Sequence, residues 1–169
     1  ADPFEEEAVQ AHLASRSPSA VERHLECGCP STAVQTLERS SPVPQGPGAS
    51  ALGHWPVQLR LVPVKAPFFE GVDLLVAADC VPFAYPDLHG TLLRGRSLVI
   101  GCPKFDDARS YARKLGEILR LNDVRSVTVA HMEVPCCHGL RWVVDRAVEA
   151  SGKSIPVRHH VFTVEGGMT

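Results

Sequence analysis

Four of the six cysteines follow short apolar segments, where a thiolate could serve as a metal ligand or a nucleophile. They are Cys80 after segment 73–79, Cys102 after segment 97–101, and the pair Cys136 and Cys137 after segment 126–132. We expect these segments to be buried parallel strands. The carboxyl ends of such strands form the ligand crevice of an open α/β sheet, so the four thiols should converge at one edge.

The adjacent residues Cys136 and Cys137 favour an iron-sulfur cluster over a single metal ion. Neighbouring side chains diverge and reach one tetrahedral ion only with distortion, whereas a 4Fe-4S cluster offers each thiolate its own iron. Gly139 begins a predicted helix, whose amino terminus favours the thiolate. His138 is the histidine placed to act on this site. The alternative is a buried structural cysteine beside an incidental one, because free cysteine is among the most buried residue types.

The remaining cysteines have structural alternatives as well. Cys80 and Cys102 each precede or adjoin a proline at a strand end, a position where packing alone explains many cysteines. Cys27 and Cys29 flank Gly28 in a tight turn outside the predicted sheet. We weigh equally that this pair completes the main site, holds a second metal ion, forms a redox pair or is structural.

Charged residues and one histidine near the strand ends also have simpler explanations. Asp106 and Asp107 suit the cap of a following helix, and Asp79 and Lys104 invite general-base and anion-binding roles. His54 either stacks on a cofactor or anchors the preceding linker to the core.

Composition places the chain among ordinary globular proteins. Of its 169 residues, 44% are hydrophobic and 21% charged, with a net charge of −2. No basic stripe indicates nucleic acid, and no apolar run approaches the roughly 18 residues of a membrane span. The amino terminus is acidic instead of signal-like, so we expect a cytoplasmic protein in which clustered cysteines bind metal instead of forming disulfides. The sequence leaves the oligomeric state open.

Strands alternate with helices after His54. The predicted strands are 57–62, 73–78, 97–100, 126–132 and 157–164, and the predicted helices are 106–121 and 139–151. Right-handed crossovers then give a small three-layer α/β domain with a mostly parallel, doubly wound, flavodoxin-like sheet.

The residues before this domain form two further parts. Residues 1–39 are predicted as a helical arm, with helices at 4–14, 20–26 and from Pro30 through Glu38. Residues 40–53 alternate Ser, Pro and Gly and are predicted as a linker. The α/β domain then spans 54–169, and it should carry the metal or cluster.

Several segments resemble the C-terminal region of ferredoxin-type iron-sulfur proteins of anaerobic prokaryotes. These segments are 27–31, 54–63, 77–82, 101–107 and 132–137, and the resemblance runs from Phe4 to Gly166. The resemblance implies a 4Fe-4S cluster, electron transfer, and either a redox partner protein or a fused ferredoxin module as partner. The chain lacks the Cys-x-x-Cys-x-x-Cys run of that module, and His138 stands where the family would place a small residue.

Three functions follow from the thiols. The first is an iron-sulfur electron-transfer domain with the cluster held by Cys80, Cys102, Cys136 and Cys137. The second is a structural or regulatory zinc module using the same thiols. The third is a thiol- or cluster-dependent enzyme acting on a small substrate.

Overall fold

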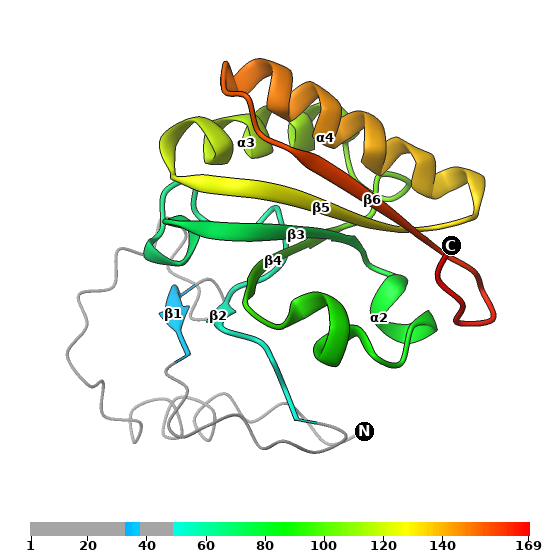
Figure 1. The fold of residues 1–169 in the computed structure, drawn as a ribbon. Helices are drawn as coiled ribbons and strands as arrows, with labels where there is room; N and C mark the ends of the chain where they lie inside the picture. Colours follow the sequence, from blue (N-terminus) through cyan, green and yellow to red (C-terminus); the bar gives the residue numbers. More distant parts are fainter. Residues whose placement is uncertain (1–32, 38–48) are drawn as a thin grey trace, which may run out of the picture.

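A computed structural model describes residues 33–37 and 49–169 and places a four-stranded parallel sheet at the centre (Figure 1). The sheet order is β4-β3-β5-β6. The strands are β3 (Val72–Ala78), β4 (Arg96–Gly101), β5 (Val124–Met132) and β6 (Val157–Phe162). The α/β fold and these four predicted strands are confirmed. The predicted helices at 4–14 and 20–26, and Cys27 and Cys29, lie outside the described residues.

Strand β3 is an interior strand of the sheet, and both of its faces are covered. It pairs in parallel with β4 on one side and β5 on the other, with Leu75 opposite Leu98 and Thr128. The five consecutive residues 74–78 are all buried. A continuous apolar run of this kind is typical of a parallel strand with material packed on both faces.

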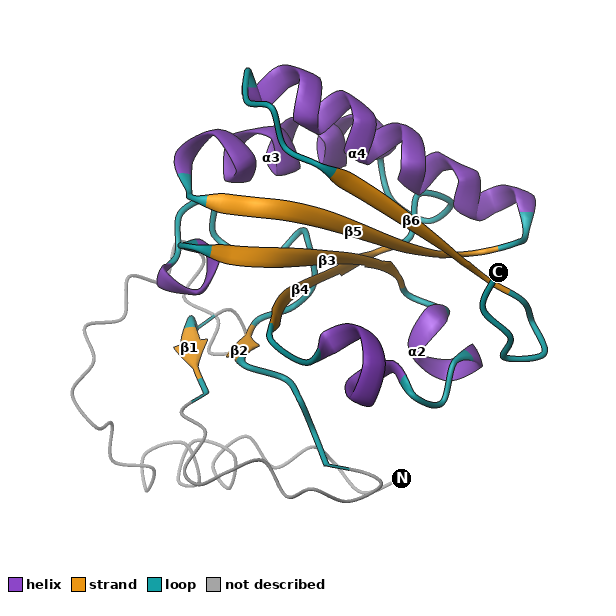
Figure 2. Ribbon diagram, in the orientation of Figure 1, coloured by secondary structure: helices purple, strands orange, loops and turns teal. Residues whose placement is uncertain are grey.

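Two long helices cover one face of the sheet (Figure 2). Helix α3 (Ala108–Leu121) begins after Asp107, whose side chain accepts a hydrogen bond from Arg109 N at 2.9 Å. Helix α4 (His138–Ser151) ends at Gly152, which adopts a left-handed φ of 69°. The helices approach closely at Gly116, where a Cβ would lie 3.3 Å from the Cβ of Ala150. Both predicted crossover helices are therefore confirmed, with a cap and a stop of the expected kind.

On the opposite face, the described residues form short helical segments. These are the 3-10 turn Pro67–Phe69, α2 (Val81–Ala84) and the π-helical turn Leu88–Leu93 (Figure 2). Leu88, Leu92 and Leu93 are buried, so the turn contributes to the core although it is not a regular α-helix.

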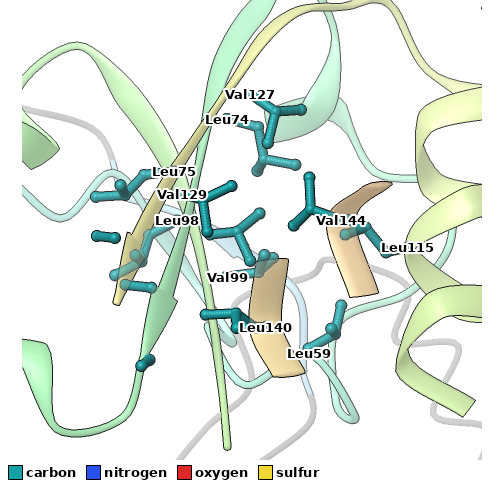
Figure 3. Close-up of a cluster of buried hydrophobic side chains, with 14 of the residues drawn as sticks. Leu59, Leu74, Leu75, Leu98, Val99, Leu115, Val127, Val129, Leu140 and Val144 are labelled. Atoms are coloured by element: carbon teal, nitrogen blue, oxygen red, sulfur yellow. The ribbon is translucent and has the colours of Figure 1, made fainter. Parts of the chain in front are cut away.

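Buried apolar side chains lie on both faces of the sheet, and one part of this core lies between the sheet and the two long helices (Figure 3). Leucine and valine side chains of the strands face Leu115 of α3 and Leu140 and Val144 of α4, and these three helical residues are fully buried. Burial of each such side chain stabilises the fold by about 1.5–3 kcal/mol relative to leaving it exposed. The described helices include none with the length and apolar character of a membrane span.

Two sequence predictions are wrong. Residues 57–62 form a turn instead of a strand: Gln58 makes one isolated parallel bridge to Ile100, and the N–H groups of Leu61 and Val62 both donate to Gln58 O. Of the apolar residues in this segment, Leu59 and Val62 are buried and Leu61 is exposed.

The second error concerns the helix predicted from Pro30 through Glu38. In its described part, β1 (Gln35–Thr36) pairs antiparallel with β2 (His54–Trp55). Ala51, shortly before β2, also packs on the domain, because it is buried and its N–H donates to His89 Nδ1 at 3.1 Å. Pairing with β2 supplies backbone hydrogen bonds that local helix propensity does not outweigh.

Candidate functional site

The thiols lie at the point where the sheet changes direction. The chain passes from β3 to β4 on one side and then returns across β3 to β5 on the other. In doubly wound sheets this switch point opens the ligand crevice beyond the carboxyl ends of the two strands. Cys80 follows β3, and Cys136 and Cys137 follow β5, so three thiols flank the switch point.

The loop that carries Cys102 reaches across the end of β3 to the Cys136–Cys137 loop. A Cβ on Gly139 would come within 3.1 Å of the Cβ of Pro103, the residue after Cys102. Strands β4 and β5 are not neighbours, since each pairs with β3. The contact between Pro103 and Gly139 therefore closes two separate loops over one strand end, and the glycine permits this approach.

The four thiols differ in exposure. Cys80 and Cys136 are exposed, Cys102 is half-buried and Cys137 is buried, and all four are free. Burial raises the pKa of the Cys137 thiol, the backbone of Met132 opposes this by a hydrogen bond, and the neighbouring Cys136 and Cys80 raise it further. Cys137 thus lies within electrostatic reach of two other thiols. Cys80, Cys136 and Cys137 thus influence one another electrostatically. Cys102 is related to them by the approach of its neighbour Pro103 to Gly139.

No three His, Cys, Asp or Glu side chains in residues 33–37 and 49–169 are arranged to hold a single metal ion. A tetrahedral zinc site needs thiols that share one ion at about 2.3 Å. A cubane cluster bonds each thiolate to a different iron and accepts a wider spacing of roughly 6–7 Å between sulfurs. Cysteine thiolates are the usual protein ligands of such a cluster.

His138 lies beside these thiols at the first residue of α4. It is exposed, and its ring stands nearly perpendicular to that of the buried His131, with 6.2 Å between centroids. His131 Nδ1 contacts the Met132 carbonyl oxygen at 3.0 Å. The rings of His131 and His138 thus lie next to each other at the end of β5.

Asp79 and Asp106 lie near the thiol loops together with Tyr111. The Tyr111 hydroxyl donates to Asp106 and, at 3.2 Å, to Gln58 Oε1. Asp79 Oδ1 is buried without a hydrogen-bond partner in the described structure. Burial and the charge of Asp106 raise the pKa of the Asp79 carboxyl. Tyr111 lies within the predicted helix 106–121, and the sequence does not single it out as a site residue.

Gly101 is the sequence signal for the position of Tyr111. A Cβ at Gly101, directly before Cys102, would lie 2.5 Å from Tyr111 Cε2. The ring therefore crosses the end of β4 where no side chain blocks it. Asp107 caps α3 as predicted, whereas Asp106 accepts the Tyr111 and Arg60 hydrogen bonds instead of capping.

Two phenylalanines project into solvent beside the thiols. Phe83 is 92% exposed and Phe105 is 89% exposed. Each follows a cysteine by three residues, and each N–H donates to the carbonyl oxygen of that cysteine, Cys80 or Cys102, at 3.2 Å. The two loops thus repeat one turn, with a thiol at its start and a free aromatic ring at its end.

His54 is a structural residue. Its ring stacks on Phe68 with 3.9 Å between centroids, its Nε2 accepts from Leu98 N at 3.0 Å, and its Nδ1 donates to Pro56 O at 3.1 Å. Burial lowers the pKa of the imidazole, and the two backbone hydrogen bonds oppose this. Of the two predicted roles, the geometry matches anchoring of the preceding segment.

Comparison with known proteins gives a fold-level relationship. The model of a family described as a Rossmann-like domain matches residues 66–169. A relative from Archaeoglobus fulgidus, carrying the name "Uncharacterized protein", is 34% identical over 115 residues, which cover 68% of this chain and 81% of the relative. No solved structure is significantly similar.

These matches overturn the resemblance to ferredoxin-type iron-sulfur proteins. The matching family is a Rossmann-like domain, and the relative's name mentions neither a ferredoxin nor an iron-sulfur protein. The segments 77–82, 101–107 and 132–137, which carried the resemblance, are the loops at the carboxyl edge of the sheet. Short motifs around cysteines were read as a family signature although they cover little of the fold.

Proposed function

The chain belongs to a family of Rossmann-like domains, and from this premise we propose that it binds an iron-sulfur cluster at the switch point and transfers electrons. The ligands are Cys80, Cys102, Cys136 and Cys137. One observation carries the proposal: the three loops after β3, β4 and β5 bring all four thiols to the carboxyl edge. The proposal rests on this placement and on no family resemblance.

The acid-base properties of Cys137 argue against a role as nucleophile. A nucleophilic cysteine needs a lowered pKa, supplied by a cation or a helix terminus. Burial and two neighbouring thiols instead raise the pKa of Cys137. Neighbouring thiolates repel one another because they carry the same charge. Bound iron would offset this repulsion, because each thiolate would then bind a cation.

Electron transfer is favoured over chemistry on a bound substrate. Two cavities, of ≈ 290 Å³ and ≈ 370 Å³, lie beside β1 and between α3 and α4 in the described part of the chain, and no thiol lines either of these two. Cys80 and Cys136 reach the surface while Cys137 is buried. A cluster in that position would be partly shielded from water yet near a partner, as electron transfer requires. The proposed setting is the reducing cytoplasm, where free thiols persist.

The test is metal analysis of the anaerobically purified chain. We expect about four irons and four sulfides per chain and broad absorbance near about 400 nm. Cys137→Ser should lose most of the iron and the absorbance together. Val134→Ala is the matched control, because it perturbs the same loop and leaves all four thiols.

Three results would contradict the proposal. One zinc without iron would support a zinc module, and absence of both metals after anaerobic reconstitution would remove the metal-binding function. Full iron content in the Cys137→Ser variant would show that the ligand set is wrong.

A further inference from the structure

The outer surface of the two long helices contains a groove that the proposed cluster site does not use. It has a volume of ≈ 370 Å³ and is lined by Arg109 and Arg113 of α3 and by Trp142, Arg146 and Glu149 of α4. In Figures 1 and 2, these helices lie side by side over the sheet. The groove is on the far side of the helix layer from the strands.

The groove is positively charged in a chain whose net charge is −2. Arg146 pairs with Glu149 at 2.7 Å, so these two charges cancel. Within the described part of the chain, neither Arg109 nor Arg113 forms an ion pair. These two arginines are one helical turn apart and therefore lie on one face of α3, with two uncompensated positive charges facing the groove.

Trp142 gives the groove an aromatic anchor. Its side chain is 42% exposed although the ring is large and mostly apolar. Tryptophan and arginine are the residue types most enriched among those that dominate binding energy in protein interfaces. Both types meet here across two helices, which no packing requirement of the core explains.

The groove begins at the same edge of the sheet as the thiols. Helix α4 begins at His138, directly after Cys137, and Trp142 lies one turn later, a rise of about 6 Å. Arg109 lies in the first turn of α3, and Asp107 ends the loop that carries Cys102. A protein seated in the groove would therefore lie beside the thiol loops. Nucleotides in this fold bind in the crevice beyond the strands, not on the outer helix face.

We propose that this groove docks the acidic surface of the protein that exchanges electrons with the chain. The inference rests on the proposed function and names the chemistry of the partner. The two free guanidinium groups attract carboxylates and orient them, and Trp142 supplies apolar contact. Charge complementarity of this kind mainly raises the association rate and selects the partner.

The test measures binding of a small acidic flavodoxin to the full chain by calorimetry, both metal-free and after iron-sulfur reconstitution. The double variant Arg109→Glu/Arg113→Glu should weaken binding about tenfold or more. Arg120→Glu makes the same charge change on α3 outside the groove and should alter the Kd less than about twofold. Binding should also weaken steeply with added salt.

The outcomes separate this inference from the proposed function. Arginine-dependent binding by a chain that takes up no iron would support the docking surface and overturn the electron-transfer function. Cluster assembly together with equal effects of the groove variant and Arg120→Glu would overturn the docking surface alone. No binding of the acidic protein, or tighter binding of a single-stranded DNA 20-mer, would also overturn it.

Discussion

The two edges of the sheet differ in how they treat polar groups. At the amino edge, buried Asn122 donates to Val64 O at 2.8 Å and Ile118 O at 2.7 Å and accepts from Ala66 N at 3.4 Å. Both ring nitrogens of His54 are hydrogen-bonded as well. Every buried polar group named here has a partner, as expected where structure alone is at stake.

The carboxyl edge breaks these rules within a few residues. Asp79 Oδ1 is buried without a partner, Cys137 is buried beside two other thiols, and Phe83 and Phe105 are almost fully exposed. Such local departures cost stability and are typical of functional sites. The comparison teaches that the polar groups named at the amino edge are satisfied by the fold, whereas the carboxyl edge departs from this pattern, as expected of the ligand site proposed there.

The largest expected contrast is between phenylalanines of the two edges. Phe69, at the amino edge, is fully buried, so Phe69→Ala should lower the free energy of unfolding by about 3–5 kcal/mol. Phe83→Ala and Phe105→Ala should change it by less than about 0.5 kcal/mol. Denaturant unfolding of the metal-free chain measures all three. A cost of 2 kcal/mol or more, roughly, for Phe83 would show that its ring is packed in solution.

Asn122→Ala should give the next largest effect. The substitution removes three hydrogen bonds and leaves buried backbone groups unpaired, at a cost of about 3 kcal/mol. Iron content should be unchanged once the variant is folded, because Asn122 is at the other edge. Loss of iron at a temperature where the variant is fully folded would break the separation between the edges.

The sequence predicted the sheet well for a physical reason. Strands buried on both faces must be continuously apolar, so the runs in β3, β4 and β5 identified themselves, and Asp107 and Gly152 marked helix ends. The strand predicted at 57–62 failed because Val57, Leu59 and Leu61 alternate with polar residues as in a strand, whereas in the turn Leu61 is exposed. β1 failed because its pairing with β2 depends on residues nearly twenty positions away.

The candidate site was predictable only in outline. Because the cysteines follow strands of one parallel sheet, the sequence predicts that they converge at its carboxyl edge, and this convergence stays a prediction. The unpaired Asp79 oxygen, the exposure of Phe83 and the groove charges depend on how loops and helices sit in three dimensions. No spacing along the chain encodes them.

The amino edge should also give a pH signature. Burial lowers the pKa of His54 below its usual 6.5. Just below that pH, the imidazole is therefore protonated more often in the unfolded chain than in the native state. The stability this imidazole provides is complete above about pH 6.5 and declines as pH falls. His54→Gln should reduce the pH dependence of the unfolding free energy between about pH 7 and 5, while Asn122→Ala should keep the pH dependence of the wild type. Equal slopes in wild type and His54→Gln would refute the assignment.

The smallest effect, and the one of opposite sign, is expected at Asp79. Its raised folded-state pKa means that the native chain binds more protons than the unfolded chain as the carboxyl titrates, so the unfolding free energy falls as pH rises through that interval. At pH 7 the buried carboxylate destabilises the native state, and Asp79→Asn removes this charge. The metal-free variant should therefore be more stable by about 0.5 kcal/mol. The gain should vanish below about pH 3.5, where both states are protonated.

Asp106→Asn is the matched control one loop away. The Tyr111 hydrogen bond, helped by Arg60, lowers the pKa of Asp106. Its carboxylate therefore stabilises the fold above about pH 3.8, and that contribution is lost as pH falls through the folded-state value. Asp106→Asn should thus lower stability at pH 7 while Asp79→Asn raises it. If both substitutions destabilise, Asp79 has a partner in solution, and the carboxyl edge follows the same rules as the amino edge.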